Sequence, residues 1–262
     1  MAITEAPLPT PAPAPDEQNS HAPDDREMTL LEHLEELRGR LTKMVVALAA
    51  AVVLVVIPIP GFNSVTGLAV DLIVANATQF GVHVQAIGPG EVFFTYLEVA
   101  LVIGAALAMP IIIFQVMAFV TPALYANEKR SLLIAVPGVF VSFICGVLFC
   151  YYLTLPFATK FLAGFLSGTI EQNWTVEKYV DFVATFLFWV GVMFELPIIM
   201  FFLSKLGVVS HQRMARFRKY AFVMAFVIGA AITPTPDPIN QTIISLPIYL
   251  LFELGIILAR FA

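Results

Sequence analysis

Long stretches without charge are the feature that most limits how this chain can fold. A bilayer core of about 30 Å requires roughly 20 apolar residues per helix, and six segments of the sequence are candidates. They are residues 44–59, 92–117, 132–156, 182–203, 220–232 and 239–259. The fifth has 13 residues, which cover about 20 Å, so we expect it to thin the bilayer or to stop short of the far side. The sequence therefore predicts an all-α integral membrane protein with six transmembrane helices, N-in/C-in, of which the fifth and sixth are short.

The composition excludes a water-soluble globule. Of the 262 residues, 59% are hydrophobic and 13% are charged, against about 25% charged in an ordinary soluble domain. Cys145 and Cys150 lie on different faces of one apolar helix, which predicts no disulfide framework. The four histidines form no HExxH pair, and the sequence contains no glycine-rich phosphate loop. We therefore expect no metal site, no cofactor and no enzymatic activity.

The first 27 residues differ from the rest of the chain. They hold six acids and one base, which account for the whole net charge of −5, and six of the eighteen prolines. A Pro-Ala repeat of this kind is typical of an extended, disordered segment. It lacks the basic start and the apolar core of a cleavable signal peptide. We expect residues 1–27 to form a cytoplasmic tail and residues 28–262 to form one membrane domain.

Basic residues are distributed unevenly between the predicted spans. Eleven lysines and arginines flank one set of span ends, whereas two, Lys160 and Lys178, flank the opposite set. Cytoplasmic loops are enriched in Lys and Arg, so the richer side is predicted to be cytoplasmic. Both termini then lie in the cytoplasm, in agreement with an even number of spans.

Acidic side chains occur among the bases of this predicted cytoplasmic surface. Residues 29–32 fit a capping box, and apolar residues at helical spacing continue it as an amphipathic lead-in to the first span. Glu35 and Glu36 lie on that helix, and Glu128 lies in the first cytoplasmic loop. Carboxylates in this setting can hold an incoming guanidinium in a bidentate manner. The alternative is an ion pair within the chain, with Arg38, Arg40 or Arg130 as the partner.

Ionisable groups inside the apolar segments are expected to have a specific role, because placing a charge near a helix centre in the bilayer costs at least about 2.5 kcal/mol of free energy. Glu195 lies deep in the fourth segment, two residues before the helix-perturbing Pro197. It is predicted either to face a ligand or a water-lined groove, or to be a neutral glutamate that is hydrogen-bonded within the bundle. Glu98 and Glu253 lie nearer the ends of their segments, where they can reach the interface, and are predicted to be structural.

A polar turn joins the fifth and sixth segments. It reads Thr-Pro-Thr-Pro-Asp-Pro from Thr233 and is followed by Asn240 and Gln241. A turn between two short helices would lie at or below the outer headgroup level, where neighbouring helices must satisfy its polar groups. It is predicted either to dock another transmembrane helix or to be a proline-rich turn in which Asp237 caps the sixth helix.

Four motifs occur in order along the chain from about residue 30 to its end. The first is HLEELRGRL from His33, and the second is FQVMAFVTPALYANEKR from Phe114. The third is FELP from Phe194, and the fourth begins with TPD at Thr235 and ends with FE at Phe252. Together they resemble the TatC family, the receptor subunits of the twin-arginine protein translocase.

The resemblance implies a cup-shaped bundle of six transmembrane helices and assigns roles to particular residues. Glu195 matches the mid-membrane glutamate that faces the concave groove in the family. The residues that match the family's signal-peptide site are Glu36, Arg38, Phe119 and Glu128. The residues that match its outer docking point for partner subunits are Thr233 or Thr235, Asp237 and Gln241.

The resemblance also implies a function. TatC proteins recognise the twin-arginine signal peptides of folded cargo. With TatA- and TatB-like single-span subunits and further TatC copies, they use the protonmotive force to move that cargo across a membrane. We expect the bacterial inner membrane as the location and no nucleic-acid partner. The rival interpretations are a proton-coupled small-molecule transporter with Glu195 and Glu98 as relay groups, and a structural scaffold.

Overall fold

The computed structural model describes residues 30–58, 63–120, 126–165, 173–233 and 238–262, with the side chains of 30–33, 120, 126–136 and 240 outside the description. The described part consists of ten α-helices, one π-helical turn and two strands of two residues each. Their bounds are α1 Leu30–Val56, α2 Val65–Gln79, β1 Val84–Gln85, α3 Glu91–Val120, α4 Ala126–Phe149, η1 Cys150–Thr154, α5 Leu155–Gly164, β2 Trp174–Thr175, α6 Val176–Met193, α7 Leu196–Lys205, α8 His211–Arg216, α9 Arg218–Ile232 and α10 Pro238–Ala259. The predicted tail, residues 1–27, lies outside the described residues.

Five membrane spans are long and apolar enough to cross a bilayer within the described part, and α9 is a sixth, shorter helix. The 15 residues of α9 cover about 22 Å, as predicted for the fifth span. The prediction of a short sixth helix is wrong, because the 22 residues of α10 cover about 33 Å. The lead-in helix and the first span form one continuous helix, α1, and the fourth span is divided into α6 and α7.

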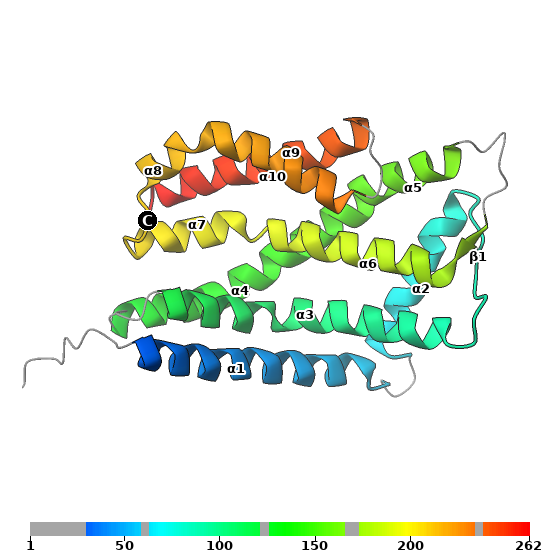
Figure 1. Ribbon diagram of the computed structural model, residues 1–262, viewed down its shortest axis with the longest axis horizontal. Coiled ribbons are helices and arrows are strands. Elements are labelled where there is room, and N and C mark those ends of the chain that lie inside the picture. The colour runs from blue at the N-terminus through cyan, green and yellow to red at the C-terminus, as the bar shows by residue number, and fades with distance from the viewer. Residues whose placement is uncertain (1–29, 59–62, 121–125, 166–172, 234–237) are drawn as a thin grey trace, which may run out of the picture.

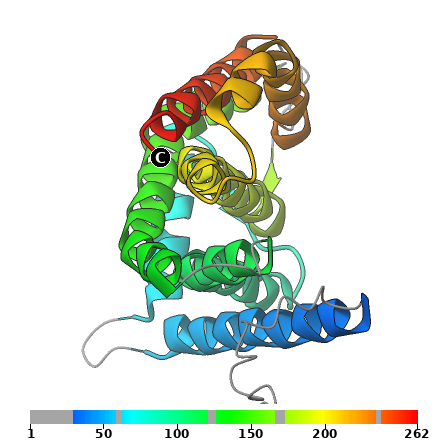
Figure 2. The ribbon, with the colours of Figure 1, turned by 90° about the vertical axis from the view of Figure 1, so that its left-hand side faces the viewer.

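The helices form a cup. Figure 1 shows α1 and α3 side by side along one edge and α9 and α10 along the opposite edge. Helix α4 continues through the π-helical turn η1 into α5 and crosses diagonally from the first edge towards the second. Viewed from the end that holds α8 and the start of α1, the helices describe an arc in which α6 and α7 lie inside the curve (Figure 2).

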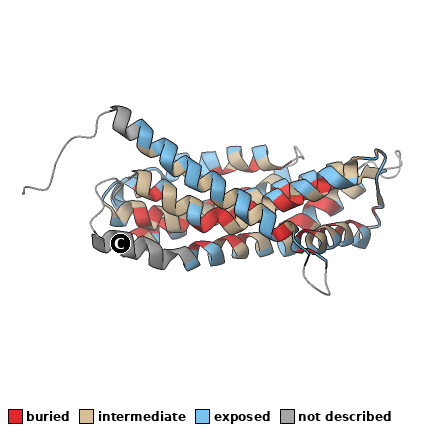
Figure 3. Cartoon of the chain, turned by 90° about the horizontal axis from the view of Figure 1, so that it is seen from below, coloured by how far each residue is buried: buried red, intermediate tan, exposed pale blue. Residues whose placement is uncertain are grey.

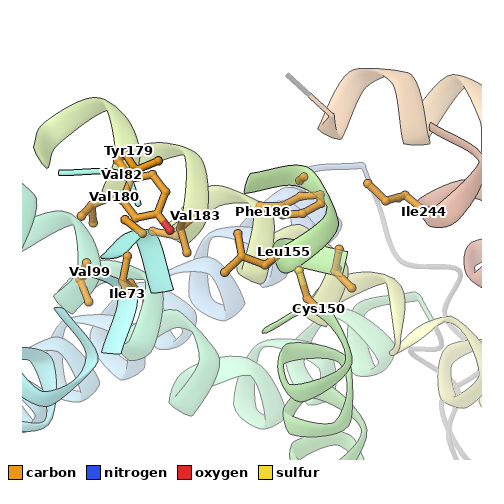
Figure 4. Close-up of a cluster of buried hydrophobic side chains, with 14 of the residues drawn as sticks. Ile73, Val82, Val99, Cys150, Leu155, Tyr179, Val180, Val183, Phe186 and Ile244 are labelled. Atoms are coloured by element: carbon orange, nitrogen blue, oxygen red, sulfur yellow. The ribbon is translucent and has the colours of Figure 1, made fainter. Parts of the chain in front are cut away.

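The main core lies where α6 meets the outer halves of the other helices. Figure 4 shows Val183 and Phe186 of α6 pointing towards Leu155 and Cys150 of the α4–α5 span. Ile244 of α10 belongs to the same cluster, so this core joins both edges of the cup. All five of these side chains are buried.

Helix α1 packs on the rest of the protein almost entirely through α3. A Cβ atom added to Gly104 of α3 would lie 3.0 Å from the Cα atom of Val52, so the absence of a side chain lets the two helices approach closely. Only 6% of the most apolar window of α1 is buried, and Figure 3 shows exposed residues along most of the helix. In a membrane, these exposed apolar residues face lipid.

The described parts of the two long outer connections contact each other and the ends of the spans. Helix α2 lies in the first connection, and its Thr66 hydroxyl donates to the Val55 carbonyl at the end of α1, at 3.0 Å. The parallel pairing of Val84 with Trp174 joins the two connections, and this strand pair was not predicted. The side chain of Asn76 is buried and accepts a hydrogen bond from the Tyr179 hydroxyl at 3.1 Å, which ties α2 to α6.

We expect Gly104→Val to lower the stability of the bundle by about 1 to 3 kcal/mol, because the new side chain would overlap α1. Thermal unfolding of the purified protein in detergent measures the change. Gly138→Ala is the matched control, since a Cβ atom there would have no neighbour within 4 Å. Equal melting temperatures for the two variants would contradict the close approach of α1 and α3.

Candidate functional site

The inner end of the cup carries a partly buried ion pair between two α1 residues, Glu36 and Arg40. The Glu36 Oε1 atom accepts hydrogen bonds from both Nε, at 3.0 Å, and Nη2 of Arg40, one helical turn later. Arg40 reaches across to α3, where its Nη1 atom donates to Oε1 of Gln115 at 3.5 Å. The alternative of an ion pair within the chain is therefore confirmed for Glu36, with Arg40 as the partner.

The second oxygen of Glu36 is arranged differently from the first. Its Oε2 atom is buried and has no hydrogen-bond partner within the described residues. A desolvated carboxylate oxygen that lacks a donor costs free energy, and a charged donor that reaches it would recover that cost. One oxygen of Glu36 is therefore fixed by the protein, and the other can still accept a donor.

The other residues predicted for this surface have different surroundings. Glu35 and Arg38 are exposed on other faces of α1, and Phe119 is half-buried near the end of α3. Glu128 lies in the first turn of α4, and its side chain is outside the description. Figure 1 places the first turns of α1 and α4 at the same end of the cup. The structure thus brings Glu36 together with Arg40 and Gln115 but not with Arg38.

The fourth span is interrupted at mid-membrane. Pro197 has no amide hydrogen to continue the helix, and α6 ends at Met193 while α7 begins at Leu196. The Ser142 hydroxyl of α4 donates to the carbonyl of Phe194 within this break, at 2.6 Å. A Cβ atom on Gly146 of α4 would lie 2.9 Å from the Cα atom of Gly191, so the two helices pack backbone against backbone beside the break.

Glu195 lies in this break and is fully buried. The prediction that it faces a ligand or a water-lined groove is therefore wrong for this structure, because the close packing of α4 and α6 encloses it. The alternative prediction, a neutral glutamate that is hydrogen-bonded within the bundle, is not observed either. The backbone of Phe143 is nearby, but neither carboxyl oxygen has a partner of hydrogen-bonding geometry among the described residues.

The two other intramembrane glutamates have structural contacts, as predicted. Glu253 of α10 pairs with Arg218 at 3.0 Å, and its Oε1 atom accepts a hydrogen bond from the Tyr249 hydroxyl at 2.8 Å. Glu98 of α3 lies close to the side chain of Asp181 on α6. These contacts tie α9 to α10 and α3 to α6.

The outer tip between α9 and α10 is held by polar contacts. The Thr233 hydroxyl is buried and donates to the carbonyl of Gly229 at 2.7 Å. The side-chain amide of Gln241 donates to the carbonyl of Phe226 at 3.0 Å. Thr235 and Asp237, the other residues predicted for this tip, lie outside the described residues. Gln241 also borders a shallow apolar hollow on the outward face of α9, which Phe222, Val223, Phe226, Val227 and Ala230 line.

Sequence reasoning missed Gln115, Ser142 and the paired glycines of α4 and α6. Ser142 is a polar residue inside the third predicted span, which has no charge, and its isolation there was an available signal. The contacts of Gln115 and of the glycines depend on which helices become neighbours, and no local pattern predicts that.

Comparison with known proteins identifies the family. A sequence model described as "Sec-independent protein translocase protein (TatC)" matches residues 32–247 of this chain. The chain belongs to the TatC family. Within the part of the chain that the structure describes, no group of three or more His, Cys, Asp or Glu side chains could hold a metal ion.

Relatives from distant organisms share most of the chain. The "Sec-independent protein translocase protein TatC" of Carboxydothermus hydrogenoformans is 33% identical over 238 residues, which cover 91% of this chain and 95% of the relative. The same-named protein of Aquifex aeolicus is 35% identical over 237 residues, covering 90% and 96%. A chloroplastic TATC of Arabidopsis thaliana is 36% identical over 226 residues, covering 86% and 64%.

A solved structure shares the fold. "Crystal Structure of Twin Arginine Translocase Receptor- TatC" superimposes with a TM-score of 0.71 at 33% identity and covers 88% of this chain and 99% of that one. The cup of six transmembrane helices is therefore the TatC fold, and this chain is a multi-pass component of a protein transport system. The small-molecule transporter interpretation gains no support from these comparisons.

We expect Ser142→Ala to destabilise the protein by about 1 to 3 kcal/mol, because the carbonyl of Phe194 would lose its donor at the break. Chemical or thermal unfolding in detergent measures the change. Cys145→Ala on the exposed face of the same helix is the control and should differ little from the unchanged protein. An unaltered midpoint for Ser142→Ala would show that the hydroxyl does not support the break.

Proposed function

We propose that this TatC protein recognises the twin-arginine signal peptides of folded cargo at its cytoplasmic surface and starts their transport across the membrane. The observation that carries the proposal is the state of Glu36. Its Oε1 atom is held by Arg40, and its buried Oε2 atom has no donor within the described part. The superimposed crystal structure is that of a twin-arginine translocase receptor, and this likeness supports the same function.

The geometry of Glu36 suits an arginine better than a lysine. The contact with Arg40 fixes the orientation of the carboxylate, and Gln115 in turn supports Arg40 from α3. A guanidinium can donate to the open oxygen and keep further N–H groups for neighbouring acceptors, whereas an ammonium is a compact point charge. We assign Glu128 at the start of α4 as the acceptor for the second arginine. Arg38 and Phe119 complete the proposed surface.

We assign the outward face of α9 and Gln241 as the docking surface for TatA- and TatB-like single-span subunits. Within a bilayer, helices associate through close packing and a few polar contacts. The hollow beside Gln241 offers both, since Val223, Val227 and Ala230 form its apolar walls. Because α9 is too short to span the bilayer alone, a longer partner helix at this face would also cover its ends. Thr233 supports this tip from within, and Thr235 and Asp237 belong to the same proposed surface.

We assign the protonmotive force as the energy source and Glu195 as its candidate responder. A carboxyl group without hydrogen-bond partners at mid-membrane is costly, and such groups are commonly functional. In this structure the group is enclosed, so proton exchange would require α4 to move away from the break.

The remaining assignments are a bacterial inner-membrane location, both termini in the cytoplasm, a cytoplasmic tail of residues 1–27, association with further TatC copies and no enzymatic activity. The distribution of bases supports the orientation.

We expect a twin-arginine signal peptide to bind the purified full-length protein more tightly than its Lys-Lys variant. Glu36→Ala should weaken Arg-Arg binding by about 10- to 100-fold, the loss of one hydrogen-bonded charge pair. Glu128→Ala should weaken it as well. Fluorescence anisotropy of labelled peptides in detergent or nanodiscs measures these affinities.

The matched control for this measurement is Glu35→Ala. It removes a neighbouring, exposed carboxylate on another face of α1 and should leave the affinity unchanged. Equal affinities for the Arg-Arg and Lys-Lys peptides would contradict the proposal, and so would equal losses in Glu35→Ala and Glu36→Ala.

A further inference from the structure

A cavity of about 630 Å³ lies between α2, α3, α6 and the α4–α5 span. Most of its wall is apolar, with Val102 and Ala106 on one side and Leu148 and Leu187 on others. Its polar lining residues all lie on α2 and η1, and they are Asn76, Gln79, Tyr151 and Tyr152. The lining helices diverge there, because α4 starts beside α3 and its continuation α5 ends on the other side of α6 (Figure 1).

The size and the lining of the cavity determine which kind of molecule can fill it. Water needs two to four polar partners, and these are confined to the side formed by α2 and η1, so most of the cavity offers water none. An apolar cavity of about 150 Å³ holds benzene, or roughly 25 Å³ per carbon atom, so this cavity has room for about two dozen carbons. A hydrocarbon chain of that size fits this apolar space.

The depth of the cavity places a headgroup near Lys160. The third predicted span, residues 132–156, ends at Pro156, which therefore marks the outer end of the hydrocarbon core on this helix. Pro156 lines the cavity, and Lys160 lies one helical turn farther out on the same face of α5. Lys160 is exposed, and no carboxylate lies within 4.0 Å of its ammonium group in the described part.

We propose that this cavity binds one acyl chain of an outer-leaflet phospholipid and that Lys160 contacts the phosphate of that lipid. The Tyr152 hydroxyl, which is exposed at the cavity rim, is placed to donate to the glycerol or phosphate oxygens. Lys160 is one of only two bases predicted on the outer side, where the distribution of charge disfavours them. Contact with a lipid phosphate gives this base a ligand.

The test is native mass spectrometry of the full-length protein with added dipalmitoyl phosphatidylglycerol. The unchanged protein should retain one such lipid more tightly than dipalmitoylglycerol, which has the same chains and no phosphate. Lys160→Gln should weaken retention of the phospholipid by at least about threefold. Ala106→Trp, which fills the cavity, should weaken it by at least about tenfold.

Lys178→Gln is the matched control, because Lys178 is the other outer base and lines a different pocket. It should stay within about twofold of the unchanged protein. Elution as a single species and an unchanged circular dichroism spectrum establish that each variant is folded, and Val147→Phe replaces Ala106→Trp if that variant is not. Undiminished retention in the filled variant would overturn the proposal. Equal retention by Lys160→Gln and Lys178→Gln, or of the two lipids, would also overturn it.

Discussion

The packing of α4 across α6 is the contact on which the rest of the structure depends. At this crossing, Gly146 and Gly191 bring the two backbones together, and the Ser142 hydroxyl binds the carbonyl of Phe194 where the fourth span is broken. Because α4 is fixed there at a slant, its two ends reach opposite edges of the cup. The inner end therefore starts beside α3, and the outer end lies towards α9 and α10. The position of the inner end of α4, the burial of Glu195 and the space of the apolar cavity all depend on this crossing.

The carboxylates of Glu36 and Glu195 lie in different surroundings, and this difference suits them to different proposed roles. Glu36 at the membrane surface keeps one oxygen bonded to Arg40 and one without a donor, which suits it to a charged ligand arriving from water. Glu195 has no donor for either oxygen but is enclosed within the bundle. The Glu36 side chain is about one-fifth exposed, whereas Glu195 has no exposed surface and becomes accessible only if helices separate. In the proposed mechanism, recognition at Glu36 and any response at Glu195 are therefore distinct steps.

Sequence reasoning predicted those features that local chemistry decides. Span existence, the short α9 and the interruption near Pro197 follow from apolar length and from the missing amide of proline. The pairing of Glu36 with Arg40 follows from their separation of one helical turn. The enclosure of Glu195, the contact of Arg40 with Gln115 and the strand pair of the outer connections depend on which helices become neighbours. Such long-range contacts have no signature in a single sequence, and that is why the predicted groove at Glu195 was wrong.

The role of Glu36 in recognition is tested most directly by export in bacteria that lack their own TatC and carry this chain with its partner subunits. The measurement is the amount of a folded reporter that reaches the far side of the membrane. We predict export with an Arg-Arg signal peptide, about tenfold or greater loss with Lys-Lys or with Glu36→Ala, and no loss with Glu35→Ala. Equal export of the Arg-Arg and Lys-Lys reporters, or full export by Glu36→Ala, would contradict this role.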